Sequence, residues 1–189
     1  MKIVHLWLKF QVLIIQLGDK KFRPYLSAEE IAWAVSRVSE ALNEKYNGKQ
    51  PIVLGVLNGA FMFCSDLVKT LTCGPEIHFV KVSSYEGTAS SGNLSRLIGI
   101  SAELKDRHVI LVEDIVDTGL TVDVLRKELA AMGPASVEVA TLLFKPDAFR
   151  GSQKPDYTGL EIPNDFVVGY GLDYNNLGRE LPELYVIND

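Results

Sequence analysis

Short runs of consecutive apolar residues alternate along this chain with longer segments in which apolar residues recur every three or four positions. The short runs predict buried strands, at residues 52–57, 78–82, 109–112 and 137–144. The periodic segments predict helices, at residues 31–42, 61–71 and 122–132. Strands that alternate with helices predict an α/β fold with a doubly wound parallel sheet and right-handed crossovers.

Local signals set the limits of these elements. Ser27 and Glu30 have the spacing of a capping box, and Gly48 closes the helix that they begin. Residues 96–101 are expected to form a strand that pairs with its predecessor. Residues 145–163 are rich in Pro, Gly, Asp and Lys and predict no regular element. Two short strands are expected after them, at residues 166–168 and 185–187.

The chain is short enough for one domain, residues 1–189, and long enough to bury a core. Its net charge of −5 argues against a nucleic-acid-binding surface, which would be rich in Lys and Arg. The two cysteines, Cys64 and Cys73, form no metal-binding or disulfide framework, so free thiols in a reducing cytoplasm are expected.

An atypical apolar extension occupies residues 1–18. Lys9 and Gln11 interrupt its apolar run, which is too short to span a membrane and precedes no small-residue cleavage site. We therefore expect no membrane association. An extra strand, a mistaken start codon and a partner-facing segment all remain open as explanations.

Residues 109–121 carry the strongest chemical signal. After the apolar run, the stretch supplies carboxylates, hydroxyls and one glycine, at Glu113, Asp114, Asp117, Thr118, Gly119 and Thr121. Open α/β sheets bind ligands here, at the carboxyl end of a strand. Glycine lets backbone amides approach an anion, and a helix N-terminus favours negative charge. We therefore expect residues 117–121 to hold a phosphate, and the carboxylates before them to bind a sugar diol or magnesium.

A solvated loop in which Asp117 or Thr118 merely caps the next helix is the simpler alternative. Three carboxylates crowded at one strand end argue against it, because their mutual repulsion calls for a cation or a ligand.

The same stretch resembles the phosphoribosyl diphosphate (PRPP) motif of the type I phosphoribosyltransferases. Further segments are similar to the hypoxanthine(-guanine) phosphoribosyltransferases of that family, in the family's order and spacing: residues 56–61, 84–85, 142–145 and 165–175. The resemblance runs from Phe22 to Ile187. It implies the type I phosphoribosyltransferase fold, in which residues 145–189 contribute a small hood that binds the base.

The resemblance also implies roles for individual residues. PRPP or nucleotide binding falls to Glu113, Asp114, Ile115, Val116, Asp117, Thr118, Gly119, Leu120, Thr121, Gly59 and Arg179. Base binding falls to Lys145, Asp165, Phe166, Val167 and Asp173. Asp117 would exchange a proton with N7 of the purine, and Mg²⁺ would be held by Asp173, Glu113 and Asp114. Ser84 and Tyr85 would be the first residues of a loop that closes over the site as a lid and excludes water during the transfer.

One position departs from the family pattern. The loop that contacts pyrophosphate through its backbone commonly has a lysine before its glycine, and here that position is Asn58. A backbone contact at Gly59 is compatible with this change, but a charge contact from residue 58 is not.

We therefore expect a magnesium-dependent purine salvage enzyme that transfers ribose 5-phosphate from PRPP to N9 of hypoxanthine, and also guanine, and releases pyrophosphate. The family implies a homodimer or homotetramer. A xanthine- or guanine-preferring transferase and a non-catalytic PRPP-sensing regulator of the same fold remain as alternatives. A kinase or GTPase is disfavoured, because the chain has no GxxxxGK[ST] loop.

Overall fold

The computed structural model describes residues 14–84, 95–98 and 102–188. Its main sheet has six strands in the order β5-β4-β3-β6-β7-β8. These are β3 (Ile52–Leu57), β4 (Glu76–Ser84), β5 (Ser95–Ile98), β6 (His108–Val116), β7 (Ser136–Phe144) and β8 (Tyr157–Glu161). All neighbours pair in parallel except β5, which is antiparallel to β4.

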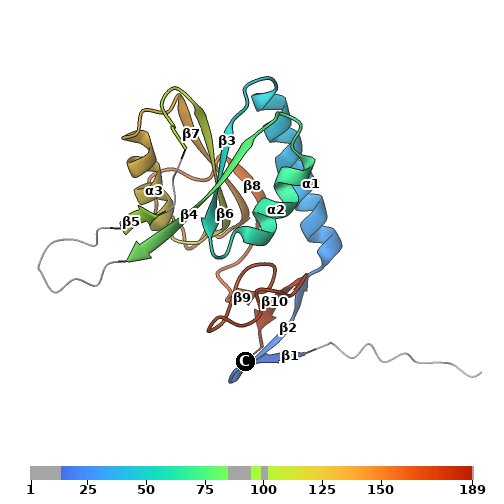
Figure 1. Cartoon of the computed structure of the whole chain (residues 1–189). Helices are drawn as coiled ribbons and strands as arrows, with labels where there is room; N and C mark the ends of the chain where they lie inside the picture. The colour runs from blue at the N-terminus through green and yellow to red at the C-terminus, as the bar shows by residue number, and fades with distance from the viewer. Residues whose placement is uncertain (1–13, 85–94, 99–101, 189) are drawn as a thin grey trace, which may run out of the picture.

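Helices cover both faces of this sheet, as the sequence predicted (Figure 1). Helices α1 (Ala28–Tyr46) and α2 (Phe61–Thr70) pack on one face, and α3 (Leu120–Ala130) packs on the other. Within β6, Ile110 and Val112 join the core of α1 and α2, while Val109 and Leu111 join that of α3. The strand is an unbroken apolar run because both of its faces are buried.

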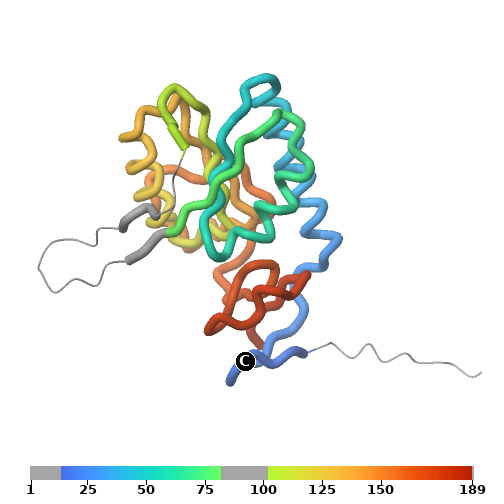
Figure 2. The backbone as a smooth tube through the Cα atoms, viewed as in Figure 1, coloured from blue at the N-terminus to red at the C-terminus, as the bar shows by residue number. Residues whose placement is uncertain are grey.

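A second, smaller sheet lies beyond the carboxyl ends of the main strands, and we call it the hood (Figure 1). It contains β1 (Ile15–Leu17), β2 (Lys20–Leu26), β9 (Val167–Val168) and β10 (Leu184–Ile187), in the order β1-β2-β10-β9. All of its pairs are antiparallel. The hood therefore joins the two ends of the described chain, which run side by side in Figure 2.

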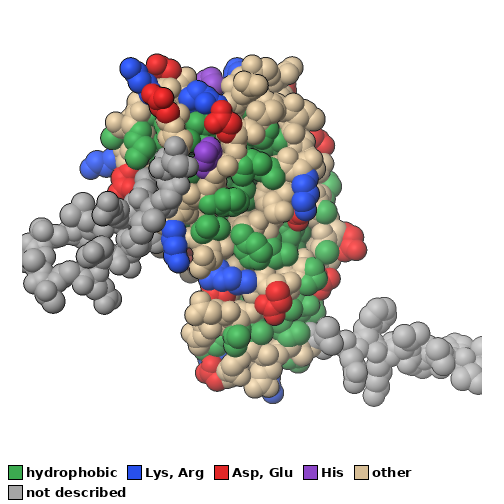
Figure 3. All heavy atoms as spheres, viewed as in Figure 1, with side chains coloured by type: hydrophobic (Ala, Val, Ile, Leu, Met, Phe, Trp, Pro, Cys, Tyr) green, Lys and Arg blue, Asp and Glu red, His purple; other side chains and the backbone are tan. Residues whose placement is uncertain are grey.

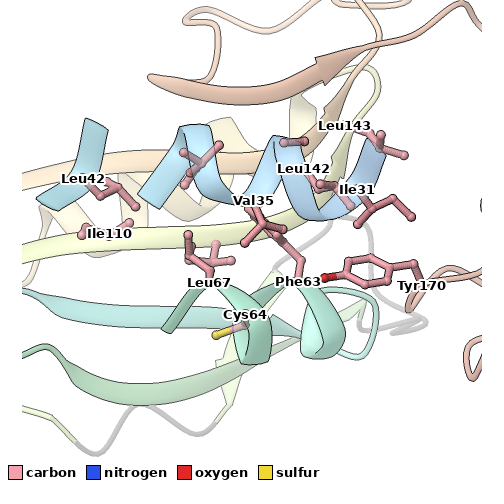
Figure 4. Close-up of a cluster of buried hydrophobic side chains, with 14 of the residues drawn as sticks. Ile31, Val35, Leu42, Phe63, Cys64, Leu67, Ile110, Leu142, Leu143 and Tyr170 are labelled. Carbon is pink, nitrogen blue, oxygen red and sulfur yellow. The ribbon is translucent and has the colours of Figure 1, made fainter. Parts of the chain in front are cut away.

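The hood and the main sheet share one core. Val167, Tyr170 and Leu184 of the hood side are buried in the same cluster as Ile31 of α1 and Phe63 of α2. Figure 4 shows Tyr170 reaching towards Phe63 and Ile31. This shared cluster fixes the hood over the ends of the main strands.

The expected limits of the hood need correction at both ends. Residues 157–161, for which no element was predicted, form β8 and extend the main sheet, so the hood starts after them. The hood also includes β1 and β2, and β1 uses the last part of the predicted N-terminal extension. Ladder hydrogen bonds to β7 stabilise β8 although its sequence has a weak strand pattern.

Strand β6 is longer than predicted. It continues through Glu113, Asp114 and Ile115 to Val116, because residues 115 and 116 pair with Leu143 and Phe144 of β7. The turn therefore begins at Asp117. The capping box is confirmed, since Ser27 Oγ accepts from Glu30 N at 3.2 Å and Glu30 Oε2 accepts from Ser27 N at 2.9 Å.

Two further expectations, for strand β5 and for the cysteines, hold within the described residues. Strand β5 pairs with Lys81–Ser84 of β4, as expected for residues 96–98, whereas residues 99–101 of the predicted strand lie outside the described residues. Cys64 and Cys73 are both free and buried. No described helix is both long enough and apolar enough to cross a membrane.

Candidate active site

The carboxyl ends of the neighbouring strands β3, β6 and β7 face the hood (Figure 1), and Gly59, residues 117–121 and Lys145 follow them in the sequence. Each of these strands ends in a turn or loop at this edge. Charged groups that would be costly inside the sheet can therefore face a ligand at this edge.

The turn between β6 and α3 presents an exposed, donor-rich surface. Thr118, Leu120 and Thr121 are exposed, and Gly119 begins the helix in the left-handed conformation at φ +80°. The first amides of a helix have no partner within the helix, so this turn offers N–H groups and hydroxyls to an anion. An anion such as phosphate is the kind of ligand that this arrangement of donors favours.

A loop after β7 supports this turn from behind. The ring of Phe149 lies so close to Gly119 that a Cβ added there would be 2.3 Å from it. Arg150 N donates to Thr118 O at 2.9 Å, and Ser152 N donates to Asp123 Oδ2 at 2.8 Å. The sequence gave no signal for Phe149, because only the tertiary structure brings it beneath the glycine.

Asp117 and Lys145 form an ion pair at the ends of the adjacent strands β6 and β7. Lys145 Nζ donates to Asp117 Oδ2 at 3.1 Å. The Lys145 side chain is only 8% exposed, whereas that of Asp117 is 45% exposed. Lys145 is therefore not solvent-exposed, as a lysine at the end of a strand usually is. A carboxylate and a fixed cation therefore stand side by side, next to the turn at residues 118–121.

The surroundings of Glu113 and Asp114 raise the pKa of both carboxyl groups. Burial raises the pKa of Glu113 well above its usual range, and the neighbouring Asp114 charge raises it further. Burial also raises the pKa of Asp114 to about 6, although hydrogen bonds from backbone amides and the charge of Arg179 oppose this shift. Ile115 and Val116 turn towards the core, and Val116 is only 2% exposed, so their side chains are not available to a ligand.

The turn after β3 is packed tightly against this acidic edge. A Cβ at Gly59 would lie 1.6 Å from Asp114 Oδ2, and a Cβ at Gly171 would lie 2.1 Å from Gly59 O. Glycine is required at both positions for β6 and for the loop between β9 and β10 (residues 169–183, here called the hood loop) to approach this turn. The peptide bond between Leu57 and Asn58 is cis, and Asn58 itself is exposed.

Asp173 and Arg179 of the hood loop are paired with each other. Arg179 Nη2 lies 2.5 Å from Asp173 Oδ1, and Arg179 Nη1 donates to Gly171 O at 2.7 Å. Both charges influence Asp114, since Arg179 lowers its pKa and Asp173 raises it. The structure therefore brings Gly59, Asp114, Asp173 and Arg179 together on one side of the site.

The expected metal-binding carboxylates do not form a complete site by themselves. Among the described residues, no three of His, Cys, Asp or Glu are grouped closely enough to hold a metal ion. Mg²⁺ is usually bound by one or two carboxylates together with substrate oxygens and water. Asp114 and Asp173 fit that partial role, because Asp173 lies close enough for its charge to raise the pKa of Asp114.

An aromatic surface marks the other side of the site, on the hood. Phe166 is 45% exposed, and its ring centroid lies 6.0 Å from that of Tyr174 and 6.3 Å from that of Phe22. The roles of Phe22 and Tyr174 were missed by the sequence analysis. Phe22 is buried, whereas its neighbours Lys21 and Arg23 are exposed. This alternation of polar and apolar residues along β2 is the sequence feature that could have predicted the burial of Phe22.

The backbone of Val167 is turned towards the open edge of the hood. Ile187 N donates to Phe166 O at 3.0 Å, and antiparallel pairing alternates bonded and open positions. The polar backbone groups of Val167 therefore point away from β10, and β9 is the last strand of the sheet. Asp165 is exposed just before this strand. Of the expected lid, Ser84 ends β4, and Tyr85 lies outside the described residues.

Comparison with known proteins agrees with this geometry. A family model described as phosphoribosyl transferase domain matches residues 24–175. The hypoxanthine-guanine phosphoribosyltransferase of Lactococcus lactis is 43% identical over 171 residues, which cover 89% of this chain and 93% of that protein. The protein of that name from Aquifex aeolicus is 34% identical and covers 92% of this chain and 99% of its own length.

A solved structure is similar in fold as well. The crystal structure of a hypoxanthine phosphoribosyltransferase from Staphylococcus aureus superposes with a TM-score of 0.81 at 34% identity, covering 88% of this chain and 91% of that one. The match of the family model to most of the chain, the relatives and the shared fold lead to one conclusion: this chain belongs to the phosphoribosyltransferase family.

Proposed function

We propose that this protein transfers the 5-phosphoribosyl group of PRPP to N9 of hypoxanthine and guanine, and releases pyrophosphate. The observation that carries the proposal is the Asp117–Lys145 pair, 3.1 Å apart, beside the exposed turn at residues 118–121. The names of the relatives support this choice of substrates.

The phosphoribosyl group would lie along the end of β6. Thr118, Thr121 and the first amides of α3 would bind its 5′-phosphate, since they are exposed and act as donors. Glu113 and Asp114, near the end of β6, would accept hydrogen bonds from the ribose hydroxyls. Gly59 and Arg179 lie on the side where the pyrophosphate would leave.

The purine would lie between the hood and the end of β7. The exposed face of Phe166 suits a flat heterocycle, and the open backbone of Val167 suits its polar edge. Lys145 would leave Asp117 and donate to the 6-oxo group, a contact that the amino group of adenine cannot accept. Asp117, so released, would take the proton from N7 as N9 attacks the sugar.

Magnesium is proposed as the cofactor, held by Asp173 and Asp114 together with oxygens of PRPP. When bound, it would neutralise charge on the departing pyrophosphate. A cation at this position would also relieve the repulsion between the two carboxylates, which contributes to the raised pKa of Asp114. Glu113, the third predicted ligand, is buried and is better suited to the ribose.

Assembly as a homodimer or homotetramer in the cytoplasm completes the proposal. Apolar side chains gather over α2 and β4 on the face shown in Figure 3, and Phe61, Ile77 and Phe79 are each at least 40% exposed. A second copy of the chain would cover them. Light scattering should give a multiple of the chain mass, and a monomer at micromolar concentration would contradict this part.

The direct test supplies PRPP, magnesium and one purine base at a time, and follows nucleotide formation by absorbance. Hypoxanthine and guanine should both give nucleotide, and adenine should give none. The rate should fall to background when EDTA removes the metal. Turnover of xanthine alone would indicate a different base preference. A lack of turnover with every base, combined with salt-sensitive nucleic-acid binding, would favour a regulator of the same fold.

A further inference from the structure

Tyr170 joins the hood to α2 through a partly buried hydrogen bond. Its side chain is 4% exposed and reaches into the core beside Phe63 (Figure 4). Its hydroxyl donates to Asp66 Oδ2 at 2.6 Å, and Lys69 Nζ approaches Asp66 Oδ1 at 2.9 Å. Burial would raise the pKa of Asp66, but the hydrogen bonds from Tyr170 and Lys69 outweigh it and lower the pKa, so the acceptor is ionised.

The backbone around Tyr170 needs this support. Tyr170 has φ +46°, a left-handed conformation that is unfavourable for a residue with a side chain, and it lies between Gly169 at φ +99° and Gly171 at φ +101°. Tyr170 N donates to Leu181 O at 2.8 Å. Contacts from both the backbone and the side chain therefore hold this turn in place.

The residues next to Tyr170 carry the contacts that complete the pyrophosphate side of the site. Gly171 rests on the carbonyl of Gly59, so its position sets how closely the hood approaches the turn after β3. Gly171 N donates to Arg179 O at 2.9 Å, and Arg179 Nη1 donates back to Gly171 O at 2.7 Å. Arg179 in turn holds Asp173. A shift of the turn at Tyr170 would move all of these groups relative to Gly59.

We propose that the Tyr170–Asp66 hydrogen bond is a positioning device that docks the hood loop onto the Gly59 turn and so sets the affinity for the pyrophosphate moiety of PRPP. Tyr170 touches no substrate and acts through Gly171, Asp173 and Arg179. The proposal rests on the proposed function for its ligand, but the docking itself is a property of the ligand-free protein.

The test compares Tyr170→Phe with Tyr157→Phe. Tyr157 donates to a carboxylate as well, Glu138 Oε2 at 2.8 Å, but it lies on β8, away from the hood. Tyr170→Phe should raise the KM for PRPP, and for pyrophosphate in the reverse reaction, about tenfold, since hydrogen bonds to charged groups are among the stronger ones. The KM for hypoxanthine should change less than about twofold, because Phe166 and Lys145 are held by other contacts. Tyr157→Phe should leave both KM values unchanged.

Asp66 supplies a second pair of variants. Asp66→Asn keeps an oxygen acceptor for the Tyr170 hydroxyl and should retain most of the PRPP affinity. Asp66→Ala should reproduce the effect of Tyr170→Phe, and the double variant should be no worse than either alone, because both changes remove one interaction. Equal increases of both KM values, or additive effects in the double variant, would overturn the proposal.

Hydrogen exchange measures the docking without any substrate. Tyr170→Phe should speed amide exchange at Gly171 and Tyr174, whose N–H groups bond within the hood loop, while Tyr157→Phe should leave them unchanged. Unchanged exchange in Tyr170→Phe would refute the docking role, whatever the enzyme's activity. If the unmodified protein forms no nucleotide, the proposed function fails, and the exchange result still decides whether Tyr170 docks the loop.

Discussion

At the scale of single residues, Lys145 shows how burial changes the meaning of a side chain. A lysine that follows an apolar strand is ordinarily solvated, but here its charge is almost fully enclosed. A buried ammonium group is stable only with a partner, and Asp117 provides it. In the proposed reaction an incoming base that takes over Lys145 would release Asp117, so the ion pair would link base recognition to proton transfer.

Replacement of Asp117 by Asn tests this link. The amide keeps an oxygen acceptor for Lys145 but cannot take a proton at neutral pH, so kcat should fall about a hundredfold or more. The KM for PRPP should stay within about threefold, since the donors at residues 118–121 remain. Steady-state kinetics with saturating hypoxanthine give both values.

Asp123→Asn serves as the matched control for this variant. Asp123 is the acidic residue in the first turn of α3, and its carboxylate bonds Ser152 rather than Lys145. It should leave kcat within about twofold of the unmodified enzyme. If the kcat of Asp117→Asn were undiminished, Asp117 would not be the group that accepts the proton.

The raised pKa of Asp114 predicts that the free energy of unfolding depends on pH. Its pKa is raised by burial from 3.8 to about 6, so the folded protein holds this proton more tightly than the unfolded chain. Stability contributed by the protonated form is therefore lost as the pH rises through the interval from about 4 to 6. Above that interval the charged carboxylate destabilises the fold by an amount on the order of 1–3 kcal/mol.

Asp114→Asn should accordingly increase the free energy of unfolding near neutral pH, and the increase should shrink near pH 4. Urea denaturation at the two pH values measures both. The variant should also lose PRPP affinity, because the charge is kept for a ligand rather than for stability. A neutral-pH stability equal to or below that of the unmodified protein would contradict the burial argument.

At the scale of elements, β6 and the turn after it organise the site. The strand delivers carboxylates at its end, the turn exposes donors, and the helix supplies unpaired amides. The loop of Phe149 then fills the space behind the turn, where Gly119 leaves room for the ring. The turn is thus shaped by its own glycine and by a segment thirty residues later.

Gly119→Ala tests this packing, with Gly48→Ala as its control. Both glycines have left-handed backbones, φ +80° and +71°, but a Cβ at Gly48 would meet nothing within 4 Å. Gly48→Ala should cost about 1 kcal/mol from backbone strain alone. Gly119→Ala should cost more than that in thermal denaturation and should raise the KM for PRPP. Equal costs with unchanged KM would show that Phe149 does not support the turn.

At the scale of the whole molecule, the hood and the main sheet are one cooperative unit. Hood residues such as Val167 and Leu184 are buried with residues of α1 and α2 in a single cluster. Lys145 and Phe166, which are expected to hold the base together, come from the main sheet and the hood respectively. Any ligand between them must therefore stabilise both sheets at once.

One unfolding transition is therefore expected, with the same midpoint by far-UV circular dichroism and by tryptophan fluorescence. Inosine monophosphate with magnesium, at about a hundred times its Kd, should stabilise the fold by about 2.7 kcal/mol. This corresponds to a rise in Tm of roughly 5–10 °C for a chain of this size. Two transitions, of which the ligand shifts only one, would show that the hood unfolds by itself.

Much of the fold could be predicted from the sequence, because its strongest signals are local. Buried parallel strands are unbroken apolar runs, amphipathic helices have a 3.6-residue period, and the capping box fixes the start of α1. The turn at residues 117–121 is equally local, since glycine, hydroxyls and a helix start are adjacent in the chain. The family resemblance rested on such contiguous segments as well.

The tertiary structure decided what depends on distant segments. Strand β8 forms because its backbone pairs with that of β7. The hood combines β1 and β2 from the N-terminal part of the chain with β9 and β10 from the C-terminal part. The Asp117–Lys145 pair, Phe149 beneath Gly119, and Tyr170 on Asp66 each join residues from separate elements. Local pattern determines which elements form, but burial and pairing between elements determine which charges meet and what they can do.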